Sequence, residues 1–215
     1  MPEVQKSQRQ KIVIVNTGCA NISSVRFALE RLGVTVEVSD NKDVITRADK
    51  VFLPGVGTAA AAMASITQKD LSSTLQSLTQ PVLGVCLGMQ LMVESSAEGS
   101  LENRLGDSQD DIPCLSLMPG HVARMEANGL RLPHMGWNTV SHNDDTLFKG
   151  IPQDTYFYFV HSFAVPEYAH TLASCNYGNP FSAAINKDNF FGVQFHPERS
   201  SDAGAQLLTN FVNLE

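Results

Sequence analysis

One stretch of the chain, residues 81–95 (PVLGVCLGMQLMVES), constrains the fold more than any other. An apolar run meets Cys86, which has Gly84 and Gly88 two positions to either side, and a second apolar run follows. Glycine, cysteine and glycine at alternate positions form the cysteine version of the nucleophile elbow, a strained turn from a strand into a helix. The glycines are needed because this turn brings neighbouring backbone very close. The stretch therefore predicts a strand over 81–85, a raised thiol and a helix.

Cys86 is a candidate nucleophile because of where the turn would place it. The N–H groups and positive dipole end of a following helix favour a thiolate over a thiol. A thiolate attacks electrophilic carbon, and the N–H of Leu87 would be placed to receive the developing oxyanion. The alternative is a buried structural cysteine, since free cysteine is among the most buried residue types. The motif alone does not separate these two interpretations.

The first half of the chain alternates between short apolar runs and helical patterns. Strands are expected over 11–16, 34–38, 50–53 and 81–85, and helices over 21–32 and 58–78, the second with a break near Thr67. This alternation predicts right-handed crossovers and a parallel sheet covered on both faces. Ligands bind beyond the carboxyl ends of such strands. Because the PGVG turn (54–57) and Cys86 both lie at strand ends, they should face one crevice.

The second half of the chain has a different pattern. Residues 98–113 are polar and acidic, typical of a surface loop. The pattern then predicts hairpin-like strands, a last strand and a closing helix; these are 121–125, 130–132, 138–141, 155–165, 172–177, 182–186, 190–195 and 201–214. The predicted fold is α/β, with a largely parallel central sheet flanked by helices and an added antiparallel section. Residues 1–10 are expected to form a loose polar tail before a single domain, 11–215.

Composition excludes several classes of protein. A chain of 215 residues with 43% hydrophobic and 17% charged residues has an ordinary globular composition. A formal net charge of −7 argues against nucleic-acid binding. The four cysteines contain no C-x-x-C pair, so neither a zinc site nor a disulfide scaffold is indicated, and we expect a reducing, cytoplasmic setting. No apolar run is long enough for a membrane span, and no metal or cofactor is expected.

A second group of candidate residues lies in FFGVQFHPERS, residues 190–200. Pro197 biases His196 toward an extended conformation, in which residues two apart project to the same side. His196 and Glu198 should therefore lie together, and a carboxylate beside an imidazole fixes its tautomer and stabilises the imidazolium. A lone histidine is usually structural, but this neighbourhood favours a triad completed by Cys86.

Five motifs carry a family resemblance. GVCLGMQ (84–90), VQFHPERS (193–200) and PGVG (54–57) resemble the signatures of the class I, triad-type glutamine amidotransferases. These enzymes have a flavodoxin-like fold. LPHMGWN (132–138) and YFVHSF (158–163) narrow the resemblance to the glutaminase subunits of imidazole glycerol phosphate synthase. The likeness extends from about residue 11 to the C-terminus.

The resemblance implies a role for each matching residue. Cys86 is the nucleophile, His196 the general acid and base, and Glu198 the carboxylate that orients it. The oxyanion is expected to be held by Gly55, Val56 and Leu87. Glutamine is expected to be bound by Gly57, Gln90 and Ser162. The side chains expected to face a partner are Met135, Trp137, Tyr158 and Arg199.

The resemblance also implies an activity and a partner. Glutamine would be hydrolysed through a cysteine thioester without a cofactor. Its ammonia would pass, within a heterodimer, to a (β/α)₈-barrel cyclase that makes imidazole glycerol phosphate and aminoimidazole carboxamide ribotide in histidine biosynthesis. Three alternatives remain open at this point. They are a class I amidotransferase of anthranilate, GMP or carbamoyl phosphate synthesis, a stand-alone cysteine hydrolase or thiol sensor, and a non-catalytic binding subunit.

Overall fold

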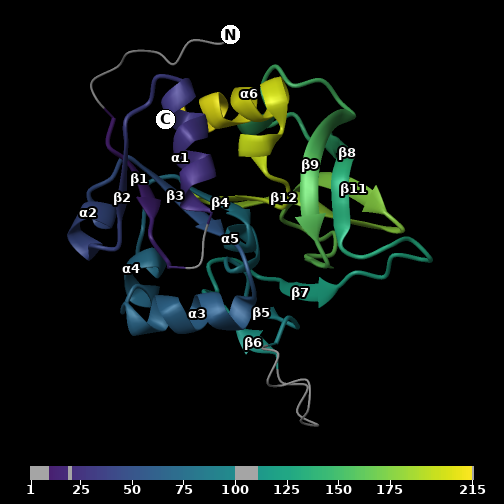
Figure 1. The fold of residues 1–215 in the computed structure, drawn as a ribbon, viewed down its shortest axis with the longest axis horizontal. Helices are drawn as coiled ribbons and strands as arrows, with labels where there is room; N and C mark the ends of the chain where they lie inside the picture. Colours follow the sequence, from purple (N-terminus) through teal and green to yellow (C-terminus); the bar gives the residue numbers. More distant parts are fainter. Residues whose placement is uncertain (1–9, 19–20, 100–110, 215) are drawn as a thin grey trace.

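A nine-stranded mixed sheet runs through the molecule, and helices cover both faces of its parallel half (Figure 1). The structure is a computed structural model that describes residues 10–18, 21–99 and 111–214. Five neighbouring strands are parallel; in spatial order they are β2 (Val36–Ser39), β1 (Ile12–Val15), β3 (Lys50–Gly55), β4 (Val82–Cys86) and β13 (Phe190–Val193). This is the flavodoxin-like order, which confirms the predicted parallel half.

Strand β1 shows why its sequence is continuously apolar. Ile12 and Ile14 pack into the core cluster that includes α1 (Ile22–Arg31) and α6 (Ser201–Val212). Val13 and Val15 belong to the opposite cluster, with α3 (Ala59–Gln68) and α4 (Ser72–Gln76). Figure 1 shows the two helix pairs on opposite sides of the sheet. Because both faces are buried, every position of the strand must be hydrophobic.

The added antiparallel section is also confirmed. It continues the sheet beyond β13 in the order β12 (Asn179–Lys187), β11 (Thr171–Tyr177), β8 (His134–His142) and β9 (Thr155–His161). A small second sheet consists of β10 (Phe163–Ala164), β7 (His121–Arg124), β5 (Ser95–Ser96) and β6 (Ile112–Pro113). Strand β13 pairs with β4 in parallel and with β12 in antiparallel, so the two halves of the large sheet meet along it.

Three of the predicted elements differ in the structure. The strand expected over 155–165 is divided at Ser162 into β9 and β10, which belong to different sheets. Residues 130–132 form no strand, because Asn128 and Gly129 both have positive φ and close a turn in which Leu130 N–H donates to Ala127 O (2.9 Å). The helix expected after Cys86 is a single turn, α5 (Leu87–Gln90). It ends there because N–H groups of residues 115–117 bind the carbonyls of residues 91–93. These bonds draw the chain away from a helical path.

The helices of the first half differ in smaller ways. The 58–78 pattern is interrupted as predicted, by a turn between α3 and α4. A short helix, α2 (Lys42–Thr46), was not predicted; the Asn41 side chain caps it by accepting the Asp43 N–H (2.9 Å). Asn21 precedes α1, but its side chain makes no capping bond. No helix in the described ranges is long and apolar enough to cross a bilayer.

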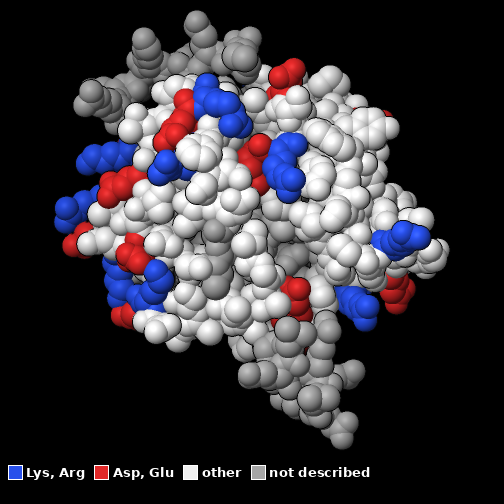
Figure 2. All heavy atoms as spheres, viewed as in Figure 1, with Lys and Arg blue, Asp and Glu red and all other residues white. Residues whose placement is uncertain are grey.

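Charged side chains are scattered over the molecular face drawn in Figure 2. Lys, Arg, Asp and Glu alternate over the side that carries α2, and the middle of this face is largely uncharged. The face therefore offers no continuous basic patch in its described part. Residues 1–9 and most of the acidic stretch lie outside the described residues. The tail and the single domain 11–215 stay predictions.

Candidate active site

Cys86 ends strand β4 in a strained backbone conformation, with φ 54° and ψ −112°. A Cβ atom on Gly88 would lie 1.7 Å from the carbonyl oxygen of Leu53, and one on Gly84 would lie 2.7 Å from the Met89 nitrogen. No side chain fits in either space. The register places Gly55 of β3 directly beside Cys86. The predicted elbow is therefore present, and its glycines are required by close backbone contact.

A hollow of about 360 Å³ opens beside the Cys86 side chain, and we call it the Cys86 hollow. It is lined by segments from both halves of the sheet: Asn21, Val56, Gly57, Cys86, Leu87, Gln90, Glu98, Pro133, Val160, His161, Ser162, Phe163, His196 and Arg199. Cys86 and His196 thus share one crevice with the PGVG turn, as their positions at strand ends predict. Of the remaining predicted residues, Gly55 lies beside Cys86 in the sheet, and Glu198 lies behind His196, outside the lining. Met135, Trp137 and Tyr158 also lie outside the lining.

Hydrogen bonds hold both the side chain and the backbone of His196 in place. Its Nδ1 donates to Glu198 Oε1 at 2.8 Å, and only 7% and 1% of the two side chains are exposed. The His196 N–H donates to Tyr158 O in β9 (2.8 Å), and Ser200 Oγ donates to His196 O (2.7 Å). Because Nδ1 is engaged, Nε2 is the ring nitrogen available on the side of Cys86.

The protonation state of His196 is set by competing effects. Burial disfavours the imidazolium, but the interactions of the ring with the Cys86 sulfur and the Glu198 carboxylate outweigh burial. They raise the pKa of His196 to about 10. At neutral pH the folded chain therefore favours an imidazolium beside the sulfur. This state can give a proton to a leaving group.

Gln194 is a site residue that the sequence analysis missed. Its side chain is fully buried, and its Nε2 lies 3.7 Å from Cys86 Sγ. Its Oε1 accepts from Gln90 Nε2 at 2.9 Å, and the same nitrogen of Gln90 donates to Phe163 O at 2.8 Å. Gln90 therefore has only its carbonyl oxygen left for a ligand. The sequence signal that could have identified Gln194 is its position two residues before His196 in an extended segment, which places both side chains on the same side of the chain.

Exposed aromatic side chains cover the outer face of the β8–β9 pair. In this pair Trp137 lies opposite Tyr158, with ring centroids 6.1 Å apart, and the Arg199 guanidinium lies 4.6 Å from the centre of the Tyr158 ring. Met135 and Trp137 are 60% and 52% exposed. Tyr156, which the sequence analysis did not single out, is 59% exposed. This apolar face adjoins the Cys86 hollow, because Arg199 contacts Tyr158 of the face and also lines the hollow.

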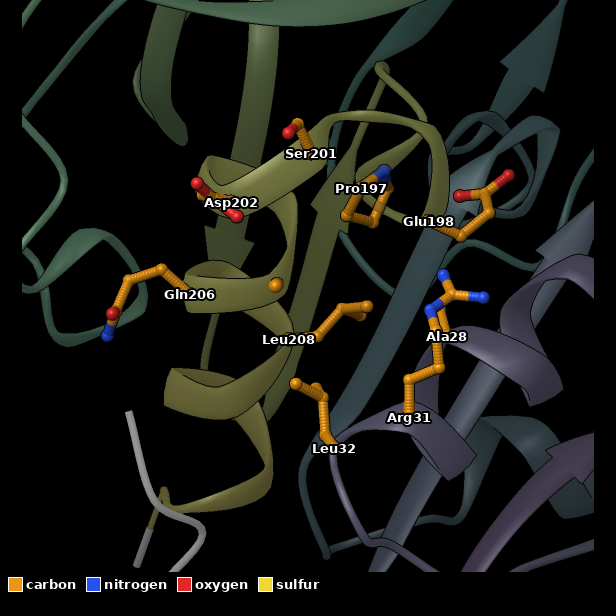
Figure 3. Close-up of a pocket in the computed structure, with 10 residues that line it drawn as sticks. Ala28, Arg31, Leu32, Pro197, Glu198, Ser201, Asp202, Gln206 and Leu208 are labelled. Atoms are coloured by element: carbon orange, nitrogen blue, oxygen red, sulfur yellow. The ribbon is translucent and has the colours of Figure 1, made fainter. Parts of the chain in front are cut away.

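A larger hollow of about 620 Å³ lies between α1 and α6 (Figure 3). Figure 3 shows Arg31 and Glu198 on its α1 side and Asp202 and Gln206 on α6. No cysteine or histidine is among the described residues that line it. The described lining of the larger hollow therefore offers neither a thiol nor an imidazole, and the smaller hollow holds the candidate chemistry.

The other described cysteines have no such surroundings. Burial raises the pKa of Cys114 to about 11 and that of Cys175 to about 12, so both are inert thiols near neutral pH. Cys86, Cys114 and Cys175 are all free, and Cys19 lies outside the described residues. Within the described ranges no three His, Cys, Asp or Glu side chains are grouped to hold a metal ion.

The sequence profile of the class-I glutamine amidotransferases matches residues 13–214. The chain belongs to this family. Its amidotransferase relatives include proteins named imidazole glycerol phosphate synthase subunit HisH. That of Colwellia psychrerythraea is 55% identical, over 95% of this chain and 93% of the relative. That of Vibrio cholerae is 53% identical, over 95% and 99% of the two chains.

Solved structures agree with the amidotransferase fold. The crystal structure of a glutamine amidotransferase from Thermotoga maritima has a TM-score of 0.60 at 16% identity, and the match covers 92% of this chain and 80% of that one. The structure of PurLQS from Thermotoga maritima has a TM-score of 0.67 at 17% identity, with coverage of 96% and 99%. At this identity the likeness shows the fold alone, and it confirms the predicted fold class.

Proposed function

We propose that this amidotransferase hydrolyses glutamine and serves as the glutaminase subunit of imidazole glycerol phosphate synthase in histidine biosynthesis. The single observation that carries the chemistry is the meeting of Cys86 with the His196–Glu198 pair over one hollow. The pathway is supported by relatives of 50–55% identity along nearly the whole chain, all named HisH. That identity favours this pathway over anthranilate, GMP or carbamoyl phosphate synthesis.

In the first step the Cys86 thiolate adds to the carboxamide carbon of glutamine. The N–H groups of Val56 and Leu87 stabilise the oxyanion, with Gly55 shaping the turn that presents the first of them. The His196 imidazolium then gives its Nε2 proton to the amide nitrogen. The C–N bond breaks, ammonia leaves, and a γ-glutamyl thioester remains on the sulfur.

In the second step His196, now neutral, takes a proton from water as the water oxygen adds to the thioester carbon. The C–S bond then breaks, which frees glutamate and restores the thiolate and imidazolium. Glu198 accepts the Nδ1 hydrogen bond throughout and stabilises the charged ring. Gln90, through its free carbonyl oxygen, and Ser162 and Gly57, which also line the hollow, hold glutamine in place.

The ammonia must reach its acceptor directly, because in bulk water it is protonated and is no longer a nucleophile. We therefore propose that a (β/α)₈-barrel cyclase docks over the Cys86 hollow as a heterodimer. The apolar face of exposed Met135, Trp137 and Tyr156 and half-buried Tyr158 supports this, since aromatic and Met side chains are enriched at interface centres. Arg199, stacked on Tyr158, joins this face to the hollow.

Glutamine turnover tests the function. Ammonia release is measured for the chain alone, with the cyclase, and with the cyclase and its nucleotide ligand. The isolated chain is expected to be nearly inactive and the loaded complex active, with Cys86→Ala removing the activity of the complex. Full turnover by the chain alone would refute dependence on a partner and favour a stand-alone hydrolase. Failure of the loaded complex to release ammonia would overturn the function.

The Trp137 side chain, on β8, is more than half exposed, so the variant Trp137→Ala tests docking. We expect its affinity for the cyclase to fall about tenfold or more, since buried interface tryptophans commonly contribute 2 kcal/mol or more. Phe27→Ala, an exposed aromatic on α1, is the matched control and should bind normally. Calorimetric titration measures both. Equal affinities for the two variants would exclude the β8–β9 face as the interface.

A further inference from the structure

The Gln194 side chain is buried, polar and unused by the mechanism above. The orientation of its amide is determined by its neighbours. Phe163 O can only accept, so Gln90 must direct its nitrogen toward that carbonyl. The same nitrogen donates to Gln194, so Gln194 must direct its oxygen toward Gln90. The Nε2 of Gln194 is therefore directed at Cys86 Sγ, 3.7 Å away.

The chain of hydrogen bonds continues outward through two buried histidines. His161 Nδ1 donates to Phe163 O (2.9 Å), so its Nε2 accepts from His134 Nδ1 (3.0 Å). His134 Nε2 then accepts from Asn138 Nδ2 (3.3 Å), which also donates to Asn176 O (2.9 Å). Only one tautomer of each neutral ring satisfies this order. Burial lowers the pKa of His134 to about 4 and that of His161 to about 3, so both rings stay neutral near pH 7.

We propose that Gln194 supports the Cys86 thiolate by donating an N–H to its sulfur, and that His134 and His161 act as positioning residues for this contact. An N–H donor stabilises the charged sulfur more than the neutral thiol. It adds no net charge, so it does not compete with the His196 imidazolium. The two histidines hold Phe163 O, which holds Gln90, which in turn orients Gln194. This inference rests on the proposed function only in taking Cys86 as a reactive thiolate.

Other groups near the sulfur must be kept constant in a test of pH dependence. His196 faces Cys86 directly, with Glu198 behind it. His161, Glu98 and Arg199 line the same hollow. None of these is changed by substituting Gln194. A difference in the pH profile of Cys86 between wild type and a Gln194 variant would therefore report on the amide.

The test measures alkylation of Cys86 by iodoacetamide as a function of pH, followed on the Cys86 peptide by mass spectrometry. Gln194→Met keeps the approximate volume and removes the N–H donor. We expect its alkylation profile to move up by about one pH unit, so that alkylation slows roughly tenfold at pH values below both midpoints, where one unit is a tenfold change in thiolate fraction. Gln206→Met, on α6, is the control and should match wild type. An unchanged profile in Gln194→Met would overturn the proposal.

A measurement on the wild-type protein covers the case in which Gln194→Met does not fold. With ¹⁵N-glutamine labelling, the side-chain N–H signals of Gln194 should shift with the same pH midpoint as Cys86 alkylation. That shift should disappear in Cys86→Ala. Gln194 signals that do not respond to the titration of Cys86 would equally overturn the proposal.

The positioning role is tested at His161. His161→Asn retains a side-chain N–H near the position of Nδ1, and His161→Leu does not. We expect the Asn variant to keep most of the wild-type alkylation profile and the Leu variant to behave like Gln194→Met. Identical profiles would contradict the positioning role. Because alkylation needs no glutamine, these results are independent of whether the complex hydrolyses glutamine.

Discussion

The backbone at Cys86 has a positive φ of 54°, a conformation that costs on the order of 1–3 kcal/mol at a residue with a side chain. Its surroundings maintain it, through the contact of α5 with β3 and the parallel pairing of β4. The result is a sulfur whose neighbours are the His196 ring, the Gln194 amide and the Val160 carbonyl. At the scale of single residues, reactivity is therefore a property of these fixed neighbours.

Glu198→Gln tests the electrostatic part of this arrangement. The folded chain raises the pKa of His196 from 6.5 to about 10, so its stabilising contribution is complete below pH 6.5 and is lost as the pH rises toward 10. Removing the carboxylate charge should lower this pKa and make the unfolding free energy fall less over that interval. Imidazole NMR and denaturation across the interval measure the two effects. Asp202→Asn, exposed on α6, is the control, and equal behaviour of the two variants would contradict the prediction.

At the scale of elements, the close contact between β3 and the start of α5 positions the elbow. Leu53 O occupies the space that a side chain on Gly88 would need, so the two segments approach backbone to backbone. Gly192 in β13 is less restrictive, because the nearest atoms to a Cβ there would be Met89 Cγ, at 2.7 Å, and Met89 Cβ, at 2.9 Å, and not a backbone atom. Met89 Cγ can move by rotation of the side chain, and Met89 Cβ by a small shift of the single-turn α5, whereas the Leu53 carbonyl is held in the sheet.

Gly88→Ala should therefore cost stability and reactivity together. We expect a loss of about 3 kcal/mol or more in the free energy of unfolding, at the upper end for overpacking, with Cys86 displaced and slowly alkylated. Gly192→Ala is the matched control and should cost less, about 2 kcal/mol, with Cys86 still reactive. Urea denaturation and iodoacetamide labelling check both variants. Equal losses would show that the β3–α5 contact is not the limiting one.

At the scale of the whole molecule, the site lies where the two halves of the sheet meet. The parallel half supplies Cys86 from β4, and His196 follows β13, the strand shared by both halves. The antiparallel half supplies Val160 and His161 to the hollow, and its Tyr158 carbonyl holds the His196 N–H. The catalytic geometry therefore depends on the folding of both halves.

Acid should weaken this junction through the buried pair His134 and His161. Their pKa values in the fold, about 4 and about 3, lie below the ordinary 6.5, so their contribution to stability is present above pH 6.5 and is lost as the pH falls. We expect the free energy of unfolding to drop by about 2 kcal/mol or more between roughly pH 7 and pH 5. His134→Gln/His161→Asn should show a smaller drop. Gln206→Ala, on α6, keeps both rings and their hydrogen bonds and should retain the wild-type dependence. Urea denaturation at each pH measures the three proteins.

The amino-acid sequence alone was enough for features that depend on local pattern. The elbow, the parallel strands and the HPE segment follow from apolar runs, glycine spacing and the extended bias before Pro197, each set within a few residues. The resemblance supplied the family, which the comparisons confirm. The roles of the individual site residues remain predictions.

Only the tertiary structure decided features that join distant segments. Helix α5 ends after one turn because the N–H groups of residues 115–117 donate to the carbonyls of residues 91–93, just after the helix. No pattern within residues 87–95 predicts this. Gln194 and the His134–His161 pair acquire significance only when β8, β9 and β13 are brought together around the sulfur. Hydrogen-bond direction is determined by which acceptor faces which donor across the fold, and sequence spacing does not encode that.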